Sequence, residues 1–317
     1  MKRWLVAVLI CIVIVSAFVA YLITLPPPSK VVAPKIGIFY YLWYGAPDSD
    51  NWNASKFIDY PVLGNYSSSN ATVIKQQLIW MKDAGIDFVV ISWWGFYSPY
   101  EQFIDNATKQ VFEVAEDNMT NLKFAIMVEP FNKTGNSYDY SGIYDHIYDE
   151  FVVPYSSIYY NYTTMPLICF FNDENLTDNG SIPLDRRFNT VLVGQSPYVQ
   201  WVYTDLDYYV QPSRVPYTNE ISVTPRFDDS RYRTPSCVVD PNLTQGTYDK
   251  EWENAIKLWK DGRIDTIMIT SWNEYVERTE IEPHYDGTAN NTDPYFLYDK
   301  TKDYINQIQQ FAEQEHL

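Results

Sequence analysis

Residues 266–277 read T-I-M-I-T-S-W-N-E-Y-V-E, a short apolar run that passes directly into polar and acidic residues. The run at 266–271 is apolar on consecutive positions rather than on alternate ones, which is typical of a parallel strand buried on both faces. The acids Glu274 and Glu277 follow the point where this strand ends. The stretch therefore predicts a buried parallel strand with acidic groups at its carboxyl end.

Seven similar runs precede this one, at 36–43, 88–93, 124–128, 167–171, 191–193, 199–203 and 221–224. Segments of helical period lie between or after them, at 71–84, 100–118, 143–152, 248–260 and 297–314, and only the helices near the fourth and fifth strands are poorly marked. Eight strands alternating with helices in roughly 280 residues predict an α/β protein with a single (β/α)8 TIM barrel. A doubly wound open sheet is the alternative, but it would normally carry a Gly-rich phosphate loop, and neither GxGxxG nor GxxxxGK[ST] occurs.

The amino-terminal segment has a different character. A short tail at 1–3 contains Lys2 and Arg3, and the uncharged stretch Trp4–Leu25 follows it. As a helix this stretch would span roughly 33 Å, enough to cross a bilayer core of about 30 Å. We expect a transmembrane signal anchor at 4–25, a Pro-rich linker at 26–34 and the barrel domain at 35–317. A cleaved signal peptide is the alternative, although its apolar region is usually shorter, about 7–15 residues.

Asn-x-Ser/Thr sequons point to the side of the membrane on which the barrel lies. Eleven are present, at Asn53, Asn65, Asn70, Asn106, Asn118, Asn132, Asn161, Asn175, Asn179, Asn242 and Asn290. This number predicts exposure to a glycosylation machinery. An Asn- and Thr-rich composition that produces sequons by chance is the alternative. We expect a single-pass membrane protein whose barrel is extracytoplasmic, at the cell surface or in a secretory lumen.

Composition excludes several classes of function. The formal net charge of −17 argues against a nucleic-acid partner, which needs a basic face. Only three His and three Cys are present, so a His-rich metal centre or a disulfide scaffold is not expected, and no cofactor is predicted. We expect Cys169 to be a buried inert thiol rather than bridged to Cys237, and His284 to lie at the surface. The 10 Trp, 28 Tyr and 16 Phe suit a cleft that must stack on sugar rings and also form hydrogen bonds.

Polar and aromatic residues gather after the predicted strands, where a barrel places its chemistry. Carboxylates ringed by Trp and Tyr favour sugar hydrolysis, because aromatic faces stack on rings while two carboxyl groups divide the acid and base roles. The residues at these positions include Tyr41, Trp94, Glu129, Asp173, Tyr203, Asp229 and Asn273. Arg231 and Arg233 either bind an acidic sugar or pair with the excess of carboxylates.

Glu274 and Glu277 are the candidate catalytic pair. In an extended strand their side chains would point to opposite faces, about 10 Å apart along the chain. If the chain turns helically from Asn273 or Glu274, the same spacing brings the Cβ atoms to about 5–6 Å. Retaining glycosidases hold their two carboxyl groups about 5–5.5 Å apart. An acidic, solvated loop is the alternative, since Glu280, Glu282 and Asp286 follow.

Several segments resemble glycoside hydrolase family 99, the endo-α-mannosidase family, along most of 35–314. Residues 61–68 (P-V-L-G-N-Y-S-S) look like the family's P-x-L-G-x-Y-S-S, and 128–132 (V-E-P-F-N) resembles its I-E-P-[FY]-[NS]. Residues 85–95, from Gly85-Ile86-Asp87 to Ser92-Trp93-Trp94-Gly95, resemble its second strand. Most specific is 269–283, I-T-S-W-N-E-Y-V-E-R-T-E-I-E-P, which is similar to I-T-S-F-N-E-W-H-E-G-T-Q-I-E-P. The sequence is identified as a divergent member of this family.

The resemblance implies a retaining, endo-acting barrel enzyme that cuts α-mannosyl chains without a metal or a protein nucleophile. The residue at the Glu274 position would act as base on the substrate's own 2-hydroxyl, and that at the Glu277 position as acid. Tyr41, Trp94, Glu129, Asp173 and Tyr203 match positions that line the cleft. The chain departs from the family where His and Gly become Val276 and Arg278, and where Gly-Pro-Gly-Tyr-x-Asp becomes T-P-R-F-D-D at 224–229.

Three functions follow from these observations. The first, which we favour, is a membrane-anchored glycosidase whose partner is an α-mannosyl-containing glycan. The second is a glycan-binding protein that keeps the fold and has lost turnover, as the changes at Val276 and Arg278 suggest. The third is a structural cell-surface protein.

Overall fold

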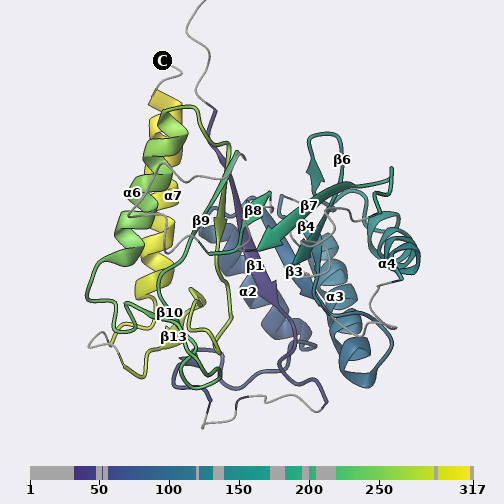
Figure 1. Ribbon diagram of the computed structural model, residues 1–317, viewed down its shortest axis with the longest axis horizontal. Coiled ribbons are helices and arrows are strands. Elements are labelled where there is room, and N and C mark those ends of the chain that lie inside the picture. The colour runs from purple at the N-terminus through teal and green to yellow at the C-terminus, as the bar shows by residue number, and fades with distance from the viewer. Residues whose placement is uncertain are drawn as a thin grey trace, which may run out of the picture. The chain divides into compact units, whose positions relative to one another are not determined.

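The computed structural model describes residues 32–47, 52, 56–118, 121–130, 139–171, 183–194, 200–204, 219–288 and 292–314, without the side chain of residue 118 (Figure 1). Residues 34–308 form one compact unit. The predicted anchor at 4–25 lies outside the described residues. Among the helices within these ranges, none is long and apolar enough to cross a membrane.

Eight parallel strands surround the core of this unit. They are β1 (Lys35–Tyr41), β3 (Phe88–Trp93), β4 (Lys123–Val128), β6 (Met165–Phe171), β7 (Asn189–Gly194), β8 (Trp201–Val202), β9 (Glu220–Val223) and β12 (Thr266–Ile269). They pair in the order β8-β7-β6-β4-β3-β1-β12-β9. This is the order of the chain itself, read around a ring that is interrupted between β8 and β9. The predicted barrel strands are confirmed, and the doubly wound alternative is excluded.

Side chains bridge the interruption between β8 and β9. The main-chain nitrogen of Val202 donates to Glu220 Oε2 at 3.0 Å. The carbonyl of Tyr203, just after β8, accepts from Ser222 Oγ at 2.9 Å and also from Thr270 Oγ1. The parallel sheet is therefore nearly closed, and buried side-chain hydrogen bonds take the place of the missing ladder.

The helices follow the strands as their apolar periodicity predicts. They are α2 (Ala71–Asp83), α3 (Pro99–Asn118), α4 (Tyr140–Ile147) continued by the π-helical turn η1 (Tyr148–Val152), α6 (Thr247–Lys260) and α7 (Phe296–Gln314). Asn70 caps α2 through its side-chain oxygen, which accepts from Thr72 N at 3.0 Å. Between β6 and β9 the described residues contain no helix, so the described part of the chain does not show the full set of eight.

Five two-residue strands lie outside the barrel. Their pairings are antiparallel: β2, after β1, pairs with β13, after β12, while β10 and β11 pair within the loop after β9, and β5 pairs with β6. The five strands are β2 (Tyr60–Pro61), β5 (Asn161–Tyr162), β10 (Phe227–Asp228), β11 (Val238–Val239) and β13 (His284–Tyr285). These pairings give the loops around the strand ends a fixed arrangement.

Apolar side chains fill the barrel interior in layers, because alternate residues of each strand point inward. Phe39 of β1 lies opposite Val90 of β3, and Val90 lies opposite Ala125 of β4. All three are fully buried in one cluster. Gly37 leaves room for this packing, since a Cβ atom there would lie 2.4 Å from both Met268 Sδ and the Phe88 ring.

Gly37→Ala is therefore expected to destabilise the protein by about 1–3 kcal/mol through overpacking. Thermal unfolding measures this loss as a lower Tm. In a Met268→Ala background the added methyl group gains space, so the same change should cost clearly less. Equal costs in both backgrounds would contradict this account of the interior.

Candidate active site

The loop after β12 forms a closed hairpin-like turn that carries both candidate acids. Ser271 N donates to the carbonyl of Thr279 at 2.8 Å, and the hydroxyl groups of the same two residues lie 2.9 Å apart. Ser271 Oγ also accepts from Glu274 N at 2.9 Å. Residues 275–278 form consecutive turns. The chain thus leaves the extended conformation before Glu274, as a pairing of Glu274 with Glu277 requires.

Asn273 joins this loop to the end of β1. Its Oδ1 accepts from Tyr41 N at 2.9 Å, and its Nδ2 donates to Tyr41 O and to Tyr66 Oη, both at 3.0 Å. The side chain is fully buried. Asn273 therefore aligns the first and last strands of the barrel at the site, while its expected contact with substrate stays a prediction.

Glu129 lies directly after β4 and faces the same region. Its Oε1 accepts a 2.7 Å hydrogen bond from Ser92 Oγ of β3, and Ser92 Oγ accepts in turn from Trp94 Nε1 at 3.0 Å. The Trp94 ring lies 6.1 Å from that of Trp43 and 6.2 Å from that of Tyr100, both edge-on. Half-buried aromatic side chains therefore stand beside a buried acid, as the sequence predicted.

Tyr41 and Tyr203 connect opposite sides of the barrel mouth. Their hydroxyl groups lie 2.6 Å apart, and Tyr203 Oη donates to Glu277 Oε2 at 3.3 Å. Two of the residues expected to line the cleft are thus hydrogen-bonded to each other and to a candidate catalytic acid. Asp173, the remaining acid of the predicted set, lies outside the described residues.

Arg233 pairs with carboxylates, which is one of the two roles predicted for it. Its Nη1 donates to Glu277 Oε1 at 2.6 Å and to Asp229 Oδ2 at 3.1 Å. Asp229 Oδ1 accepts from Cys237 N at 2.7 Å, which fixes that carboxylate. Sequence reasoning could name Arg233 but not its partner, because Arg233 and Glu277 are 44 residues apart.

Burial raises the pKa of each of the three acids Glu129, Glu274 and Glu277. Burial, with the charge of Glu277 adding to it, raises the pKa of Glu129 to about 8 despite the Ser92 hydrogen bond. The pKa of Glu274 is raised by burial and then by the charges of Glu277 and Glu129, and its Oε1 has no partner among the described residues. Burial also raises the pKa of Glu277, but Arg233 and the Tyr203 hydroxyl oppose it. Arg233 therefore favours the charged form of Glu277, whereas Glu274 lies buried among like charges.

The cysteines behave as expected. Cys169 is a free, fully buried thiol within β6, and burial raises its pKa well above the ordinary value. Cys237 is an exposed thiol. The two are not bridged, and Cys169 is the inert thiol that its place in a barrel strand predicts.

Comparison with known proteins finds similar proteins among endo-α-mannosidases. No family model matches the chain. The chain is 23% identical over 331 residues to a mouse "glycoprotein endo-alpha-1,2-mannosidase-like protein", covering 81% of this chain and 71% of the relative. It is 24% identical over 330 residues to the mouse "glycoprotein endo-alpha-1,2-mannosidase", covering 80% and 69%. Among solved structures, the GH99 endo-α-mannosidase from Bacteroides thetaiotaomicron, solved with Bis-Tris propane, superposes with a TM-score of 0.65 at 19% identity, over 88% of this chain and 98% of that one.

The resemblance to glycoside hydrolase family 99 is confirmed. A protein described as glycoside hydrolase-like has the same fold at a TM-score of 0.58 and 14% identity, over 89% of this chain and 97% of the other. The chain is thus a distant GH99 relative with the fold of a glycoside hydrolase. At these identities, the structural likeness establishes the fold alone.

The electrostatics of Glu129 predict how stability changes with pH. A carboxyl whose pKa is raised on folding binds its proton more tightly in the folded state, so stability falls as the pH rises from the unfolded value near 4.5 to the folded value of about 8. Glu129→Gln keeps an acceptor for Ser92 and removes this dependence.

Between pH 5 and pH 9 the Tm of Glu129→Gln should therefore fall less than the Tm of the parent. Each kcal/mol of unfolding free energy that the parent loses through Glu129 corresponds to a Tm difference of about 2–4 °C. Glu113→Gln, an exposed position on α3, serves as the control and should follow the parent. If the three proteins lose Tm equally, Glu129 does not titrate in this range.

Proposed function

We propose that this chain is a retaining glycoside hydrolase that acts on α-mannosyl-containing glycans, within the chain rather than at its ends. The observation that carries the proposal is the closed loop after β12, which holds Glu274 and Glu277 at the barrel mouth beside Glu129 and an aromatic wall. The names of the mouse relatives and of the bacterial structure support the choice of mannosyl substrates.

The proposed reaction uses the substrate's own 2-hydroxyl as nucleophile. Glu274 accepts the hydroxyl proton as that oxygen attacks C1, the bond from C1 to the glycosidic oxygen breaks, and Glu277 gives its proton to the departing oxygen. A 1,2-anhydro sugar results. Water then attacks C1 while Glu277 takes its proton, the bond from C1 to O2 breaks, and Glu274 returns its proton to O2. Two displacements at C1 leave the configuration unchanged.

The proton of the acid pair has to move before this chemistry begins. In the free protein Arg233 favours a charged Glu277, whereas the leaving group needs a proton from it. A bound sugar directs its 2-hydroxyl at Glu274, and a hydrogen bond donated to the carboxylate favours the charged form of that residue. We infer that substrate binding transfers the shared proton from Glu274 to Glu277, so that the pair titrates as a unit.

Replacing the acid tests the reaction. Glu277→Gln retains an acceptor for Arg233 and cannot donate a proton to the leaving group. Hydrolysis of α-mannosyl oligosaccharides should fall by at least about 10²-fold, measured by product chromatography on a soluble fragment that begins at Lys35. Glu113→Gln is the matched control on the outer surface. Undiminished activity of Glu277→Gln would remove Glu277 from the mechanism.

A non-catalytic glycan-binding protein is the second candidate, and one observation favours it. The 2.6 Å ion pair with Arg233 favours the charged form of Glu277, which cannot donate a proton. Calorimetry with the same oligosaccharides separates the two functions. Binding without product in the parent protein would favour the second, whereas turnover would favour the first.

We also propose that the barrel lies outside the cytoplasm, tethered by the segment at 4–25. The five sequon asparagines whose side chains the structure describes, Asn65, Asn70, Asn106, Asn161 and Asn242, are all exposed, which supports their use as acceptors.

The full chain should therefore stay with membranes after alkaline carbonate washing, and its barrel should be cleaved by protease added to intact cells or, for a lumenal protein, only after the vesicles are opened. A chain that begins at Lys35 is the control and should be released. Release of the full chain by carbonate would contradict the anchor.

A further inference from the structure

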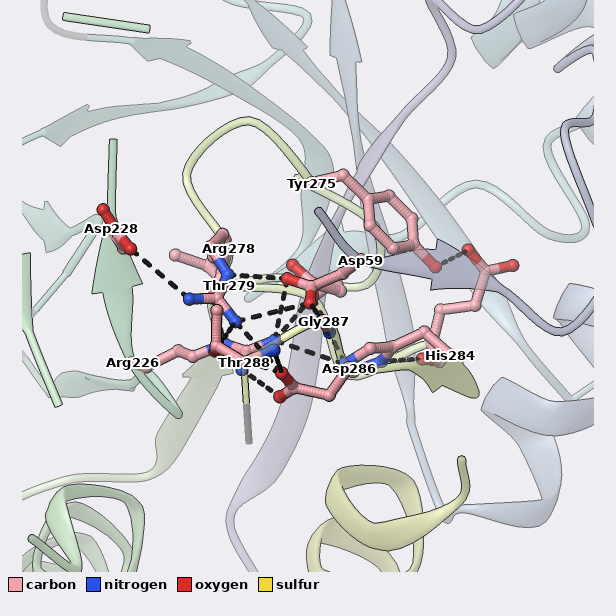
Figure 2. Close-up of polar contacts among 12 residues, drawn as sticks. Asp59, Arg226, Asp228, Tyr275, Arg278, Thr279, His284, Asp286, Gly287 and Thr288 are labelled. Atoms are coloured by element: carbon pink, nitrogen blue, oxygen red, sulfur yellow. Dashed lines mark hydrogen bonds and ion pairs between the residues drawn. The ribbon is translucent and has the colours of Figure 1, made fainter. Parts of the chain in front are cut away.

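Two buried arginines meet behind the loop that carries the acid pair. Arg226 follows β9 and Arg278 directly follows Glu277, and Figure 2 shows their guanidinium groups converging on the same two carboxylates. Arg278 Nε donates to Asp59 Oδ2 at 2.6 Å, and Arg226 Nη2 donates to the same oxygen at 3.2 Å. Both arginines also pair with Asp286. We call Asp59, Arg226, Arg278 and Asp286 the paired-arginine cluster.

The cluster is built into the interior rather than laid on the surface. Arg226 is fully buried and Arg278 is 3% exposed. Burial alone would raise the pKa of Asp59, but Arg226 and Arg278 outweigh it and hold that pKa below its usual value. Nearby His284, expected at the surface, is instead buried. Burial and Arg226 lower its pKa to about 4, so that it is neutral near pH 7. Removing one member of such a set leaves its partners buried and unpaired.

The segment that begins with Arg226 of the cluster also holds the main chain of residues 277 and 278. Arg226 Nε donates to the carbonyl of Arg278 at 3.0 Å, and Asp228 N donates to the carbonyl of Glu277 at 2.8 Å. Arg278 Nη1 reaches back to Asp228 Oδ2 at 3.3 Å. Segments 226–228 and 277–278 are therefore bonded to each other through both main chain and side chains.

The same bonded segments also position Arg233, the ion-pair partner of Glu277. Asp228 is followed by Asp229, whose carboxylate binds Arg233, and Arg233 binds the Glu277 carboxylate. Both ends of the Glu277–Arg233 ion pair thus start from segments that the cluster holds together. A shift of the cluster would change the ion pair and the position of the acid at the same time.

The backbone conformation at position 278 favours glycine, so the presence of an arginine there points to a role for its side chain. Its φ is +55°, in the left-handed region where a side chain is unfavourable and glycine is free. Glycine would satisfy this backbone at less cost, and glycine stands at the matching place in the family pattern quoted above. What arginine adds is its set of bonds to Asp59, Asp228, Asp286 and Thr288.

We propose that Arg278, together with Arg226, is a positioning residue that sets the place of the Glu277 carboxyl relative to Glu274 and Arg233. It acts through the main chain of the loop and touches no substrate. The inference rests on the proposed function for its catalytic consequence, whereas its structural consequence can be measured without any turnover.

The test compares Arg278→Gly, which suits the backbone, with Arg278→Lys, which keeps the charge but cannot bridge Asp59, Asp286 and Asp228 together. Arg187→Lys is the matched control, because Arg187 also bridges two aspartates, Asp145 and Asp185, and contacts none of the cluster. Hydrogen–deuterium exchange of peptides covering 226–229 and 271–279 is measured in each protein, with β4 as the internal reference for global opening.

In Arg278→Gly the two loop peptides should exchange at least about tenfold faster relative to β4, since bonds to charged groups are lost, with a smaller increase in Arg278→Lys and none in Arg187→Lys. In an active parent, kcat should fall by about 10²-fold with KM within about threefold, because the acid is misplaced while the sugar contacts are kept. Its pH profile should move as the contact with Arg233 is lost.

Unchanged loop exchange, or exchange that rises equally in β4, would overturn the inference whether or not the parent protein turns over. Faster loop exchange with unchanged kcat and pH profile in an active parent would also overturn it. An inactive parent would count against the proposed function alone, and the exchange result would still decide the structural claim.

Discussion

Closure of the loop between Ser271 and Thr279 is the constraint on which the site depends. In an extended strand the two acids would point to opposite faces, whereas the closed loop lets both lie at the barrel mouth. Burial and the charges of Glu277 and Glu129 raise the pKa of Glu274, because like charges held close together disfavour a further ionisation. Glu129 adds a third buried acid. Such a group cannot be fully charged near neutral pH, and this makes one of its members available as a proton donor.

Acids held this close together need a rigid loop, and buried polar contacts hold this one in place. Asn273 joins the loop to β1, the paired-arginine cluster holds it to the segment after β9, and Glu282 accepts hydrogen bonds from Gln77, Tyr66 and Tyr275 beneath it. Buried charges seldom stabilise a fold as well as apolar packing of the same volume. Their concentration behind one loop is better explained by positioning than by stability, while the apolar barrel interior carries the fold.

The sequence predicts those features that are written in local patterns. All eight barrel strands follow from consecutive apolar runs such as 88–93, and five helices follow from their period. The spacing of Glu274 and Glu277 was sufficient to name the turn that would pair them. The partners of Arg233 and Arg278 could not be predicted, because Asp59 and Arg278 are separated by 219 residues and no local pattern joins them. The surface position predicted for His284 is wrong for the same reason, since a single histidine gives no sign of Arg226, beside which it is buried.

The stereochemistry of the first product tests the central claim most directly. Proton NMR of an α-mannosyl oligosaccharide, recorded during cleavage by the fragment from Lys35 onward, distinguishes the anomer released by the enzyme from the one formed later by mutarotation. The new reducing end should appear first as the α anomer, because two acids on one loop direct two successive displacements at C1. Initial release of the β anomer would contradict it.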